Sequence, residues 1–313
     1  MRHNRAYSIQ GCGGPEVMRL DDQPIPVAGP GQVLIEVKAA GVNGIDWKIR
    51  QGLLRDVRPL AFPAVLGAEL AGVVIDGNGG RFRAGDRVMG PVGLGAYADC
   101  VATDENTLCH VPDGLTDVQA AAVPVAALTA WQALRAAGEL RPWSKVLIHG
   151  AAGGVGGFAV QFAKAASAIV SATASASSRA YVEELGADEV IDYKADRFEE
   201  HATDMDVVLD LVGGETLDRS WSVLSERGAL VSIVAPDVVS RAPANRRGVW
   251  FSMHPDPVRL AQIAGDIVAG RLLSTVAETV DFAELPAAIE RSRTGHAPGK
   301  VVADFTNYSE VGK

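Results

Sequence analysis

A run of small residues between an apolar strand-like segment and an amphipathic helix-like segment carries the clearest chemical signal in the sequence. It occupies residues 146–164, Val-Leu-Ile-His-Gly-Ala-Ala-Gly-Gly-Val-Gly-Gly-Phe-Ala-Val-Gln-Phe-Ala-Lys. Ala151, Gly153 and Gly156 stand where a larger side chain would block a tight turn, the approach of a diphosphate and the contact of helix with sheet. The pattern predicts a dinucleotide-binding turn, and its alternative is a glycine-rich turn without a ligand. The expected cofactor contacts are Gly153, Gly154, Val155 and Gly156.

The residues at the end of the next strand indicate which dinucleotide the turn binds. A protein that binds NAD usually places Asp or Glu about 20 residues past the glycines, on the ribose 2′-hydroxyl. Residues 173–179 read Thr-Ala-Ser-Ala-Ser-Ser-Arg, without a carboxylate. Hydroxyl groups and a guanidinium suit a 2′-phosphate, so Ser175, Ser178 and Arg179 predict NADPH as the cofactor. The alternative for these three residues is a helix N-cap followed by a solvated charge.

Strand and helix patterns that alternate from residue 145 onward would position this turn. Such alternation indicates βαβ units and a parallel sheet. The expected strands are 145–149, 168–174, 189–192, 206–211, 229–234 and 248–253. The expected helices are 155–166, 178–185, 215–226 and 257–269. Six parallel strands in two βαβαβ halves describe a doubly wound nucleotide-binding domain.

The first part of the chain has a different pattern. From about Gln32 to Val111, short β-rich runs alternate with clusters of Gly, Pro, Asn and Asp, which is typical of a mostly β domain. An Ala-rich helical stretch then marks the crossing into a second domain, and the strand-like end of the tail is expected to pack back on the first. We therefore predict an α/β protein with a β-rich domain at 1–120 and 270–313 and a cofactor-binding domain at 121–269.

Composition and charge exclude several classes of protein. The 313 residues carry 29 Lys and Arg against 38 Asp and Glu, and this net charge of −9 argues against binding to nucleic acid or to an anionic membrane. No stretch reaches the roughly 18 apolar residues of a membrane span, and the first residues lack the apolar core of a secretion signal. Three cysteines without a C-x-x-C pair fit reduced thiols in a cytoplasmic location. The histidines show neither metal-binding nor triad spacing, and His149 is interpreted as a core or turn residue.

Seven segments that follow one another in order resemble a known family. They lie at residues 31–37, 39–46, 66–72, 85–88, 126–132, 151–156 and 299–302. Together they resemble the medium-chain dehydrogenase/reductase superfamily, and within it the zinc-independent quinone oxidoreductase, or zeta-crystallin-like, branch. The resemblance extends over nearly the whole chain. It implies a GroES-like substrate domain joined to a Rossmann domain.

Two positions set the sequence apart from the zinc-dependent members of that superfamily. Asn43 stands where those relatives place a zinc-binding Cys, and Ala68 stands beside Glu69 where they place the His of a Gly-His-Glu motif. Catalytic zinc needs three protein ligands, so Glu69 alone cannot hold one. The four-cysteine structural lobe of those relatives has no counterpart in the sequence either. We therefore expect no metal.

The resemblance also implies which side chains lie near the reacting groups. Asn43 matches a position beside nicotinamide and substrate, where its amide would donate to a developing oxyanion. Its alternative is a turn residue in an Asn-Gly pair. Asp46 and Trp47 are expected at the substrate, with a helix-capping carboxylate and ordinary packing as their alternatives.

Further positions are implied at the cofactor. Thr129 and Lys300 would reach it, and their alternatives are a helix threonine bonded to its own backbone and a solvated lysine. Tyr193 matches a position near the adenosine 2′-phosphate, and its alternative is a surface aromatic on a loop. The remaining contacts are expected at the carboxyl edge of the sheet and on the last strand, from Leu211, Val212, Ile233, Val234 and Phe251.

Loss of zinc changes the chemistry that the resemblance implies. Without a Lewis acid, alcohol oxidation loses several kcal/mol of transition-state stabilisation, whereas conjugate reduction needs less. We therefore expect hydride transfer from NADPH to a quinone or an α,β-unsaturated carbonyl compound, in a cleft between the domains. The alternatives are a 2-enoyl-thioester reductase and a non-catalytic NADPH-binding structural or interaction protein. A homodimer is expected, because the last strand would present an apolar edge.

Overall fold

The chain divides into two compact units in the computed structural model, which describes residues 4–294 and 297–306. Unit 1 is Met1–Val125 with Pro255–Lys313, and unit 2 is Ala126–His254. The expected boundaries were 121 and 269, so helix α8 (Pro257–Val268) lies in unit 1 rather than in the cofactor-binding unit. The helix contacts strand β8 (Cys109–His110), and Val268 would lie 3.4 Å from a Cβ added at Gly114. Packing against unit 1 therefore decides where the helix belongs.

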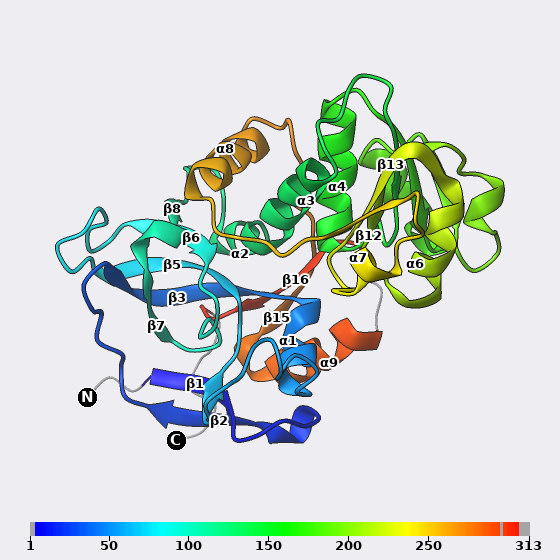
Figure 1. Ribbon diagram of the computed structural model, residues 1–313. Coiled ribbons are helices and arrows are strands. Elements are labelled where there is room, and N and C mark those ends of the chain that lie inside the picture. The colour runs from blue at the N-terminus through cyan, green and yellow to red at the C-terminus, as the bar shows by residue number, and fades with distance from the viewer. Residues whose placement is uncertain (1–3, 295–296, 307–313) are drawn as a thin grey trace. The chain divides into compact units, whose positions relative to one another are not determined.

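Unit 2 is built on a six-stranded parallel sheet (Figure 1). Its strands are β9 (Lys145–Ile148), β10 (Ile169–Ala174), β11 (Glu189–Asp192), β12 (Met205–Asp210), β13 (Leu224–Ser232) and β14 (Arg247–Trp250). They pair in the order β11-β10-β9-β12-β13-β14. In chain order this is 3-2-1-4-5-6, the strand order of a doubly wound Rossmann sheet. The expected fold of the cofactor-binding unit is confirmed.

The helices of unit 2 follow the strands along the chain. They are α3 (Pro124–Ala136), within which the two units divide, α4 (Gly154–Ala165), α5 (Arg179–Glu184), α6 (Gly214–Ser220) and α7 (Val238–Arg241). Helix α6 ends at Ser220, well before the expected end at 226. The chain tightens there into a 3-10 turn with Trp221 and Val223 buried, and β13 then begins at Leu224 to pair with β12.

Unit 1 contains two sheets (Figure 1). The seven-stranded sheet has the order β15-β16-β3-β5-β6-β8, with β7 paired to β3. Besides β8 it comprises β3 (Gln32–Val42), β5 (Glu69–Asp76), β6 (Arg87–Pro91), β7 (Cys100–Asp104), β15 (Val276–Asp281) and β16 (Lys300–Asp304). Because β16 pairs with β3, the tail of the chain completes the sheet that begins at Gln32.

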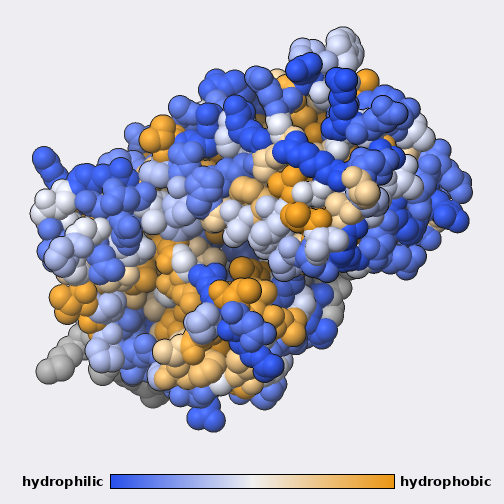
Figure 2. Space-filling model, viewed as in Figure 1, coloured by the Kyte–Doolittle hydropathy of each residue, from blue (hydrophilic) through white to orange (hydrophobic). Residues whose placement is uncertain are grey.

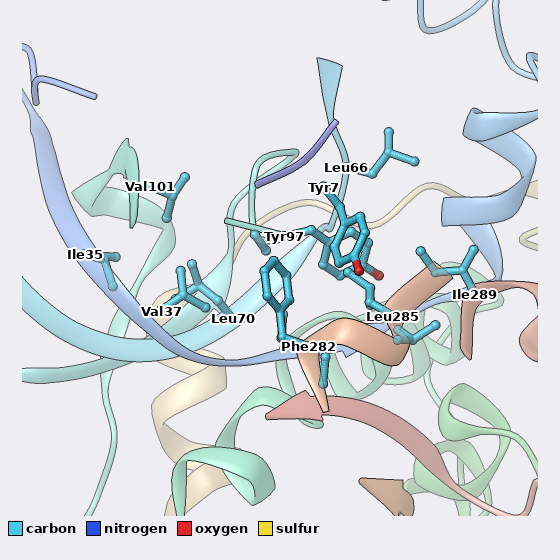
Figure 3. Close-up of a cluster of buried hydrophobic side chains, with 14 of the residues drawn as sticks. Tyr7, Ile35, Val37, Leu66, Leu70, Tyr97, Val101, Phe282, Leu285 and Ile289 are labelled. Carbon is cyan, nitrogen blue, oxygen red and sulfur yellow. The ribbon is translucent and has the colours of Figure 1, made fainter. Parts of the chain in front are cut away.

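A second, three-stranded sheet of unit 1 lies outside the sequence-based expectation. It has the order β2-β1-β4 and consists of β1 (Asn4–Ile9), β2 (Met18–Gln23) and β4 (Ala64–Val65). Its side chains join the core of the larger sheet, as the edge-on contact of Tyr7 with Phe282 at 5.0 Å between ring centroids shows. Figure 3 shows both rings in that core with Tyr97, Leu285 and Ile289.

Short helices complete unit 1. They are α1 (Gly44–Arg50), α2 (Asp117–Ala121) and α9 (Leu285–Thr294), in addition to α8. Helices α1 and α9 pack against each other, and α2 packs on β3 and β5. Across the described part of the chain, no helix combines the length and the apolar character that crossing a membrane requires.

Candidate functional site

The glycine turn of unit 2 connects β9 to α4 at the carboxyl edge of the sheet. Gly150 has a φ of +70°, a conformation that favours glycine. Thr173, at the end of β10, accepts the N–H of Gly150 at its Oγ1 (3.3 Å) and the N–H of Ala151 at its carbonyl (3.1 Å). A Cβ at Gly156 would lie 2.4 Å from the carbonyl oxygen of Gly150, so the fold itself requires glycine there.

Gly153 has a different reason to be glycine. A Cβ added there would meet only the carbonyl oxygen of Gly150, at 3.5 Å, so protein packing leaves room for a side chain. Gly153 is also the N-cap of α4 and offers no side-chain acceptor, and the first turn of the helix carries no acidic residue. The first N–H groups of a helix lack intrahelical partners and lie at its positive end. An open, uncapped helix N-terminus of this kind fits a diphosphate, so the turn passes the test for a dinucleotide.

The residues predicted to bind the 2′-phosphate lie at the ends of β10 and β11. The hydroxyl of Ser175 is 3.0 Å from that of Ser177 and 3.1 Å from that of Ser178. Arg179 donates one N–H to the carbonyl of Val190 at 2.6 Å, which engages one of the five donors of a guanidinium.

An aromatic ring and a second cation lie beside these hydroxyls. Tyr193 is 45% exposed, and its N–H donates to the carbonyl of Ala174 (3.3 Å), which places it beside the end of β10. The ammonium of Lys194 lies 5.8 Å from the centroid of the Tyr193 ring. Lys194 was not predicted as a site residue, although a basic residue two positions after the end of β11 could have indicated it.

Two buried polar residues hold the loops that follow β12 and β13. Asp210 accepts the N–H groups of Val212 (3.1 Å) and Gly213 (2.8 Å) at Oδ1, and its Oδ2 accepts the hydroxyl of Ser232 (2.8 Å). The hydroxyl of Ser232 in turn accepts the N–H of Val234 at 3.2 Å. Sequence reasoning named the loops but missed both anchors, which stand at the last position of each strand.

The predicted loop residues come together beside the glycine turn. A Cβ on Gly150 would lie 3.3 Å from Val212, and one on Gly213 would lie 3.2 Å from Val234. Leu211 and Ile233 belong to the same two loops. Phe251 follows β14, which ends at Trp250 rather than at 253, and its N–H donates to the carbonyl of Ser232 (3.1 Å). Thr129 is buried on α3, and its predicted cofactor contact stays a prediction.

A buried ion pair in unit 1, between Lys300 and Glu69, is joined by Asn43, and the three residues are far apart in the sequence. The ammonium of Lys300 donates to Glu69 Oε1 (2.7 Å), to Asn43 Oδ1 (2.7 Å) and to the carbonyl of Val42 (2.8 Å). The second oxygen of Glu69 accepts the N–H of Val125 at the start of α3, at 2.6 Å. Every donor of the Lys300 ammonium is therefore satisfied, and its burial rules out the alternative of a solvated lysine.

The amide of Asn43 is fully used as well. Its Nδ2 donates to Glu69 Oε1 (2.8 Å) and to the carbonyl of Gly41 (3.3 Å), while its oxygen accepts from Lys300. An amide nitrogen has two N–H donors, so none remains for an oxyanion. In this structure Asn43 thus belongs to a buried hydrogen-bond network with Glu69 and Lys300, whereas the sequence predicted an amide that donates to an oxyanion.

Asp46, predicted at the substrate, is the third residue of helix α1 and accepts the N–H of its N-cap residue, Asn43. It is completely buried, and its Oδ2 accepts the N–H of Asn43 (2.7 Å) and the hydroxyl of Tyr97 (2.7 Å). Its Oδ1 has no hydrogen-bond partner. Burial raises the pKa of Asp46 to about 6, against the lowering effect of the Tyr97 hydrogen bond. The capping alternative therefore fits, while the neighbouring Trp47 is partly buried against the core of unit 1.

The described side chains were also searched for a group that could bind a metal ion. Within residues 4–294 and 297–306, no three His, Cys, Asp or Glu side chains are grouped so that they could hold an ion. Glu69, which aligns with the Gly-His-Glu motif of the zinc-dependent relatives, has Lys300 as its counter-charge. The donor set at this point is thus an ion pair and an amide.

Comparison with known proteins places the chain among oxidoreductases. The family model described as the alcohol dehydrogenase GroES-like domain matches residues 29–129, and the zinc-binding dehydrogenase model matches residues 185–302. The human mitochondrial NAD(P)H oxidoreductase RTN4IP1 is 33% identical, over 95% of this chain and 88% of its own length.

Solved structures agree with this placement. The Escherichia coli quinone oxidoreductase complexed with NADPH has a TM-score of 0.87 and 27% identity, over 96% of this chain and 100% of that chain. The CurK enoyl reductase has a TM-score of 0.86 and 25% identity, over 97% of this chain and 99% of that chain. Further relatives and solved structures carry the name quinone oxidoreductase.

Proposed function

We propose a function on the premise that this chain belongs to the quinone oxidoreductase family of medium-chain dehydrogenases/reductases, and is an oxidoreductase that uses NADPH. Its proposed reaction is the zinc-independent transfer of hydride from NADPH to a quinone or to an α,β-unsaturated carbonyl compound. Bound NADPH supplies the hydride, and solvent or a nearby donor supplies the proton.

The hydrogen-bond network of Glu69, Lys300 and Asn43 is the observation that supports this class of reaction. At the positions compared with zinc ligands, Ala68 has no donor group, and Asn43 and Glu69 are an amide and a carboxylate that both bind the Lys300 ammonium. A carbonyl that is reduced directly gains much from a Lewis acid, whereas hydride addition to a quinone or to the β-carbon of an enone spreads the charge over the conjugated system. The donor set therefore favours conjugated acceptors.

Apolar surface in unit 1 supports an acceptor of this kind. The segment after α1 exposes Leu53 (62%), Val57 (77%) and Phe62 (43%). Figure 2 shows apolar side chains gathered on the face of unit 1 around α1. Small-molecule sites are lined mostly by apolar side chains with a few polar groups, which suits a planar, uncharged acceptor.

The test is NADPH consumption against quinones, 2-enones and enoyl thioesters, with identification of each product. Turnover of quinones or reduction of the carbon–carbon double bond of an enone is expected, with no stimulation by added zinc and no loss on treatment with a chelator. Turnover only with saturated aldehydes or ketones, or loss of activity to the chelator, would contradict the proposal.

A 2-enoyl-thioester reductase is the second candidate, because the fold matches an enoyl reductase nearly as well as a quinone oxidoreductase. Saturated thioester as the product, with a lower KM than for any quinone, would favour it. Tight NADPH binding without turnover of any compound would favour the remaining alternative, a cofactor-binding structural or interaction protein.

A further inference from the structure

A chain of hydrogen bonds buried in unit 2 runs from α6 to the glycine turn. His149, the residue after β9, is 1% exposed and has partners on both ring nitrogens. Its Nδ1 is 3.1 Å from Thr173 Oγ1, and its Nε2 is 3.0 Å from Ser220 Oγ. The Ser220 hydroxyl also lies 2.6 Å from the carbonyl of Thr216, and Thr173 Oγ1 lies 3.3 Å from the N–H of Gly150.

The donors and acceptors at the two ends determine the direction of every bond. A carbonyl only accepts, so the one proton of the Ser220 hydroxyl points to Thr216, and Ser220 must accept from His149 Nε2. The imidazole therefore carries its proton on Nε2. Its bare Nδ1 must then accept the proton of the Thr173 hydroxyl, whose lone pair accepts the N–H of Gly150. All groups are satisfied in a single direction, an arrangement in which hydrogen bonds strengthen one another.

We propose that His149, held as its Nε2–H tautomer, is a positioning residue that links helix α6 to the dinucleotide-binding turn. Thr173 holds the first two N–H groups of that turn, and the carbonyl of Gly150 in turn accepts the N–H of Gly153, the N-cap of α4. At the other end, Thr216 lies in the first turn of α6, directly after the loop anchored by Asp210. This relay, the hydrogen-bond chain from Gly150 through Thr173, His149 and Ser220 to Thr216, thus connects two loops of the proposed cofactor site, on which this inference rests.

The surroundings of the ring favour a permanently neutral imidazole. Phe198 packs edge-on against it at 4.6 Å between centroids, and the Arg219 guanidinium covers the Phe198 ring. Burial, with a smaller contribution from the Arg219 charge, lowers the pKa of His149 to about 3. A charged ring would need an acceptor at both nitrogens, and Thr173 could accept only by turning its own proton elsewhere.

The first test is the tautomer, measured by NMR of protein labelled with 15N in histidine. The Nε2–H form, unchanged from pH 5 to pH 8, supports the relay. An Nδ1–H form, or an imidazole that titrates near its ordinary pKa, overturns it. This readout requires neither NADPH nor substrate, so it is independent of the proposed reaction.

The second test is the dissociation constant for NADPH of the folded variants, measured by fluorescence. Thr173→Val is expected to raise it about 3- to 10-fold, and Ser220→Ala, which does not touch the turn, about 2- to 5-fold. Thr173→Ser keeps the hydroxyl and is expected to match the wild type. The matched control is Ser171→Ala, which removes a buried hydroxyl from the same strand without contact to the turn.

The outcomes separate the relay from the cofactor site itself. An unchanged dissociation constant in folded Ser220→Ala, with Thr173→Val impaired, would show that Thr173 acts alone and overturn the relay. A wild-type protein that does not bind NADPH would instead overturn the proposed function. The relay predicts that kcat at saturating NADPH stays unchanged while KM for NADPH rises.

Discussion

Gly41 shows how one missing side chain protects the ion pair of unit 1. A Cβ at this position would lie 2.3 Å from Glu69 Oε1 and 2.7 Å from the carbonyl oxygen of Ala121. Gly41→Ala is therefore expected to push Glu69 away from Lys300 and to leave buried charge unpaired, at a cost of about 3 kcal/mol in the free energy of unfolding. Urea denaturation measures this loss. Gly11→Ala, with nothing within 4 Å of the added Cβ, is the matched control and should change stability by less than about 1 kcal/mol.

Asp46 gives the stability of the protein a pH dependence of unusual sign. Its pKa is about 6 in the folded chain and 3.8 as the ordinary value, so the folded state binds the proton more tightly. Protonation therefore stabilises the protein as pH falls from about 7 to about 3, by about 3 kcal/mol in all. His149, with its folded pKa lowered to about 3, works against this, because its contribution is present above pH 6.5 and is lost as pH falls toward 3.

The two opposing groups can be separated by a variant. Asp46→Asn retains an oxygen for the Asn43 N–H and the Tyr97 hydroxyl but does not titrate. The wild type should gain about 2 kcal/mol relative to this variant between pH 6.5 and pH 4, measured by urea denaturation at each pH. A constant difference across that range would mean that Asp46 ionises normally in the folded protein.

Arg179 is expected to determine the preference for NADPH over NADH. Arg179→Asp places a carboxylate where the 2′-phosphate would bind, so the ratio of kcat/KM for NADPH to that for NADH should fall at least about 10-fold. Arg197→Asp makes the same charge change on an exposed side chain of the same unit and is the control. A ratio unchanged by Arg179→Asp would move the 2′-phosphate contact to Lys194 and Tyr193.

Residues near each other in the sequence were easier to predict than partners far apart. The Asn43 and Asp46 pair is a capping pattern readable at a spacing of three residues. The Glu69–Lys300 contact joins residues 231 positions apart, and no local pattern reports such a pairing. The sequence analysis therefore singled out Asn43 and Lys300 for ligand roles but did not predict the hydrogen bond between them.

At the scale of elements, two glycines at the start of α4 are expected to have different roles, one in stability and the other in cofactor binding. Gly156→Ala drives a methyl group against the Gly150 carbonyl at 2.4 Å and is expected to lower the free energy of unfolding by about 2 kcal/mol or more. Gly153→Ala meets only an ordinary contact at 3.5 Å, so stability should change by less than about 1 kcal/mol. Its methyl group would occupy the space left for the diphosphate, and NADPH affinity should fall at least about 10-fold. Thermal melts and NADPH titration of the two variants, side by side, check this contrast. Equal NADPH affinity of Gly153→Ala and wild type would remove the turn from the site.

The alternating strands and helices of unit 2 were predictable because each buried strand is a continuous apolar run bounded by turn residues. The three-stranded sheet of unit 1 was not, for a physical reason. Strand β2 has the sequence Met-Arg-Leu-Asp-Asp-Gln, is largely exposed and, among the described strands, pairs with β1 alone, while β4 has just two residues. Edge strands of this kind are held by pairing and not by an apolar face, so their sequences carry little periodic signal.

At the scale of the whole molecule, the return of the chain to unit 1 follows from sheet pairing. Strand β16 lies between β15 and β3 in the larger sheet, so residues 300–304 supply an interior strand to a unit that the first residues began. The tail also delivers Lys300 to Glu69. Both the sheet and the ion pair therefore depend on the last strand, which the chain reaches only after unit 2.

The open edge of the cofactor-binding sheet leads to a prediction about assembly. Strand β14 ends the sheet, pairs only with β13 among the described strands, and exposes 39% of Trp250. Because the N–H of Phe251 donates to Ser232 on β13, alternation along the strand directs the N–H of Trp250 to the open edge. We propose that a second copy of the chain pairs there, giving a homodimer of twice 32.7 kDa, about 65 kDa.

Light scattering coupled to gel filtration measures that mass. Trp250→Pro removes an edge donor and is expected to shift the protein toward the monomer mass without breaking the ladder to β13. Val258→Asp, at an exposed apolar residue of α8 in unit 1, is the control and should leave the mass unchanged. A wild-type protein that elutes at about 33 kDa would show that the edge stays unpaired, since an exposed strand of four residues is short enough to persist without a partner.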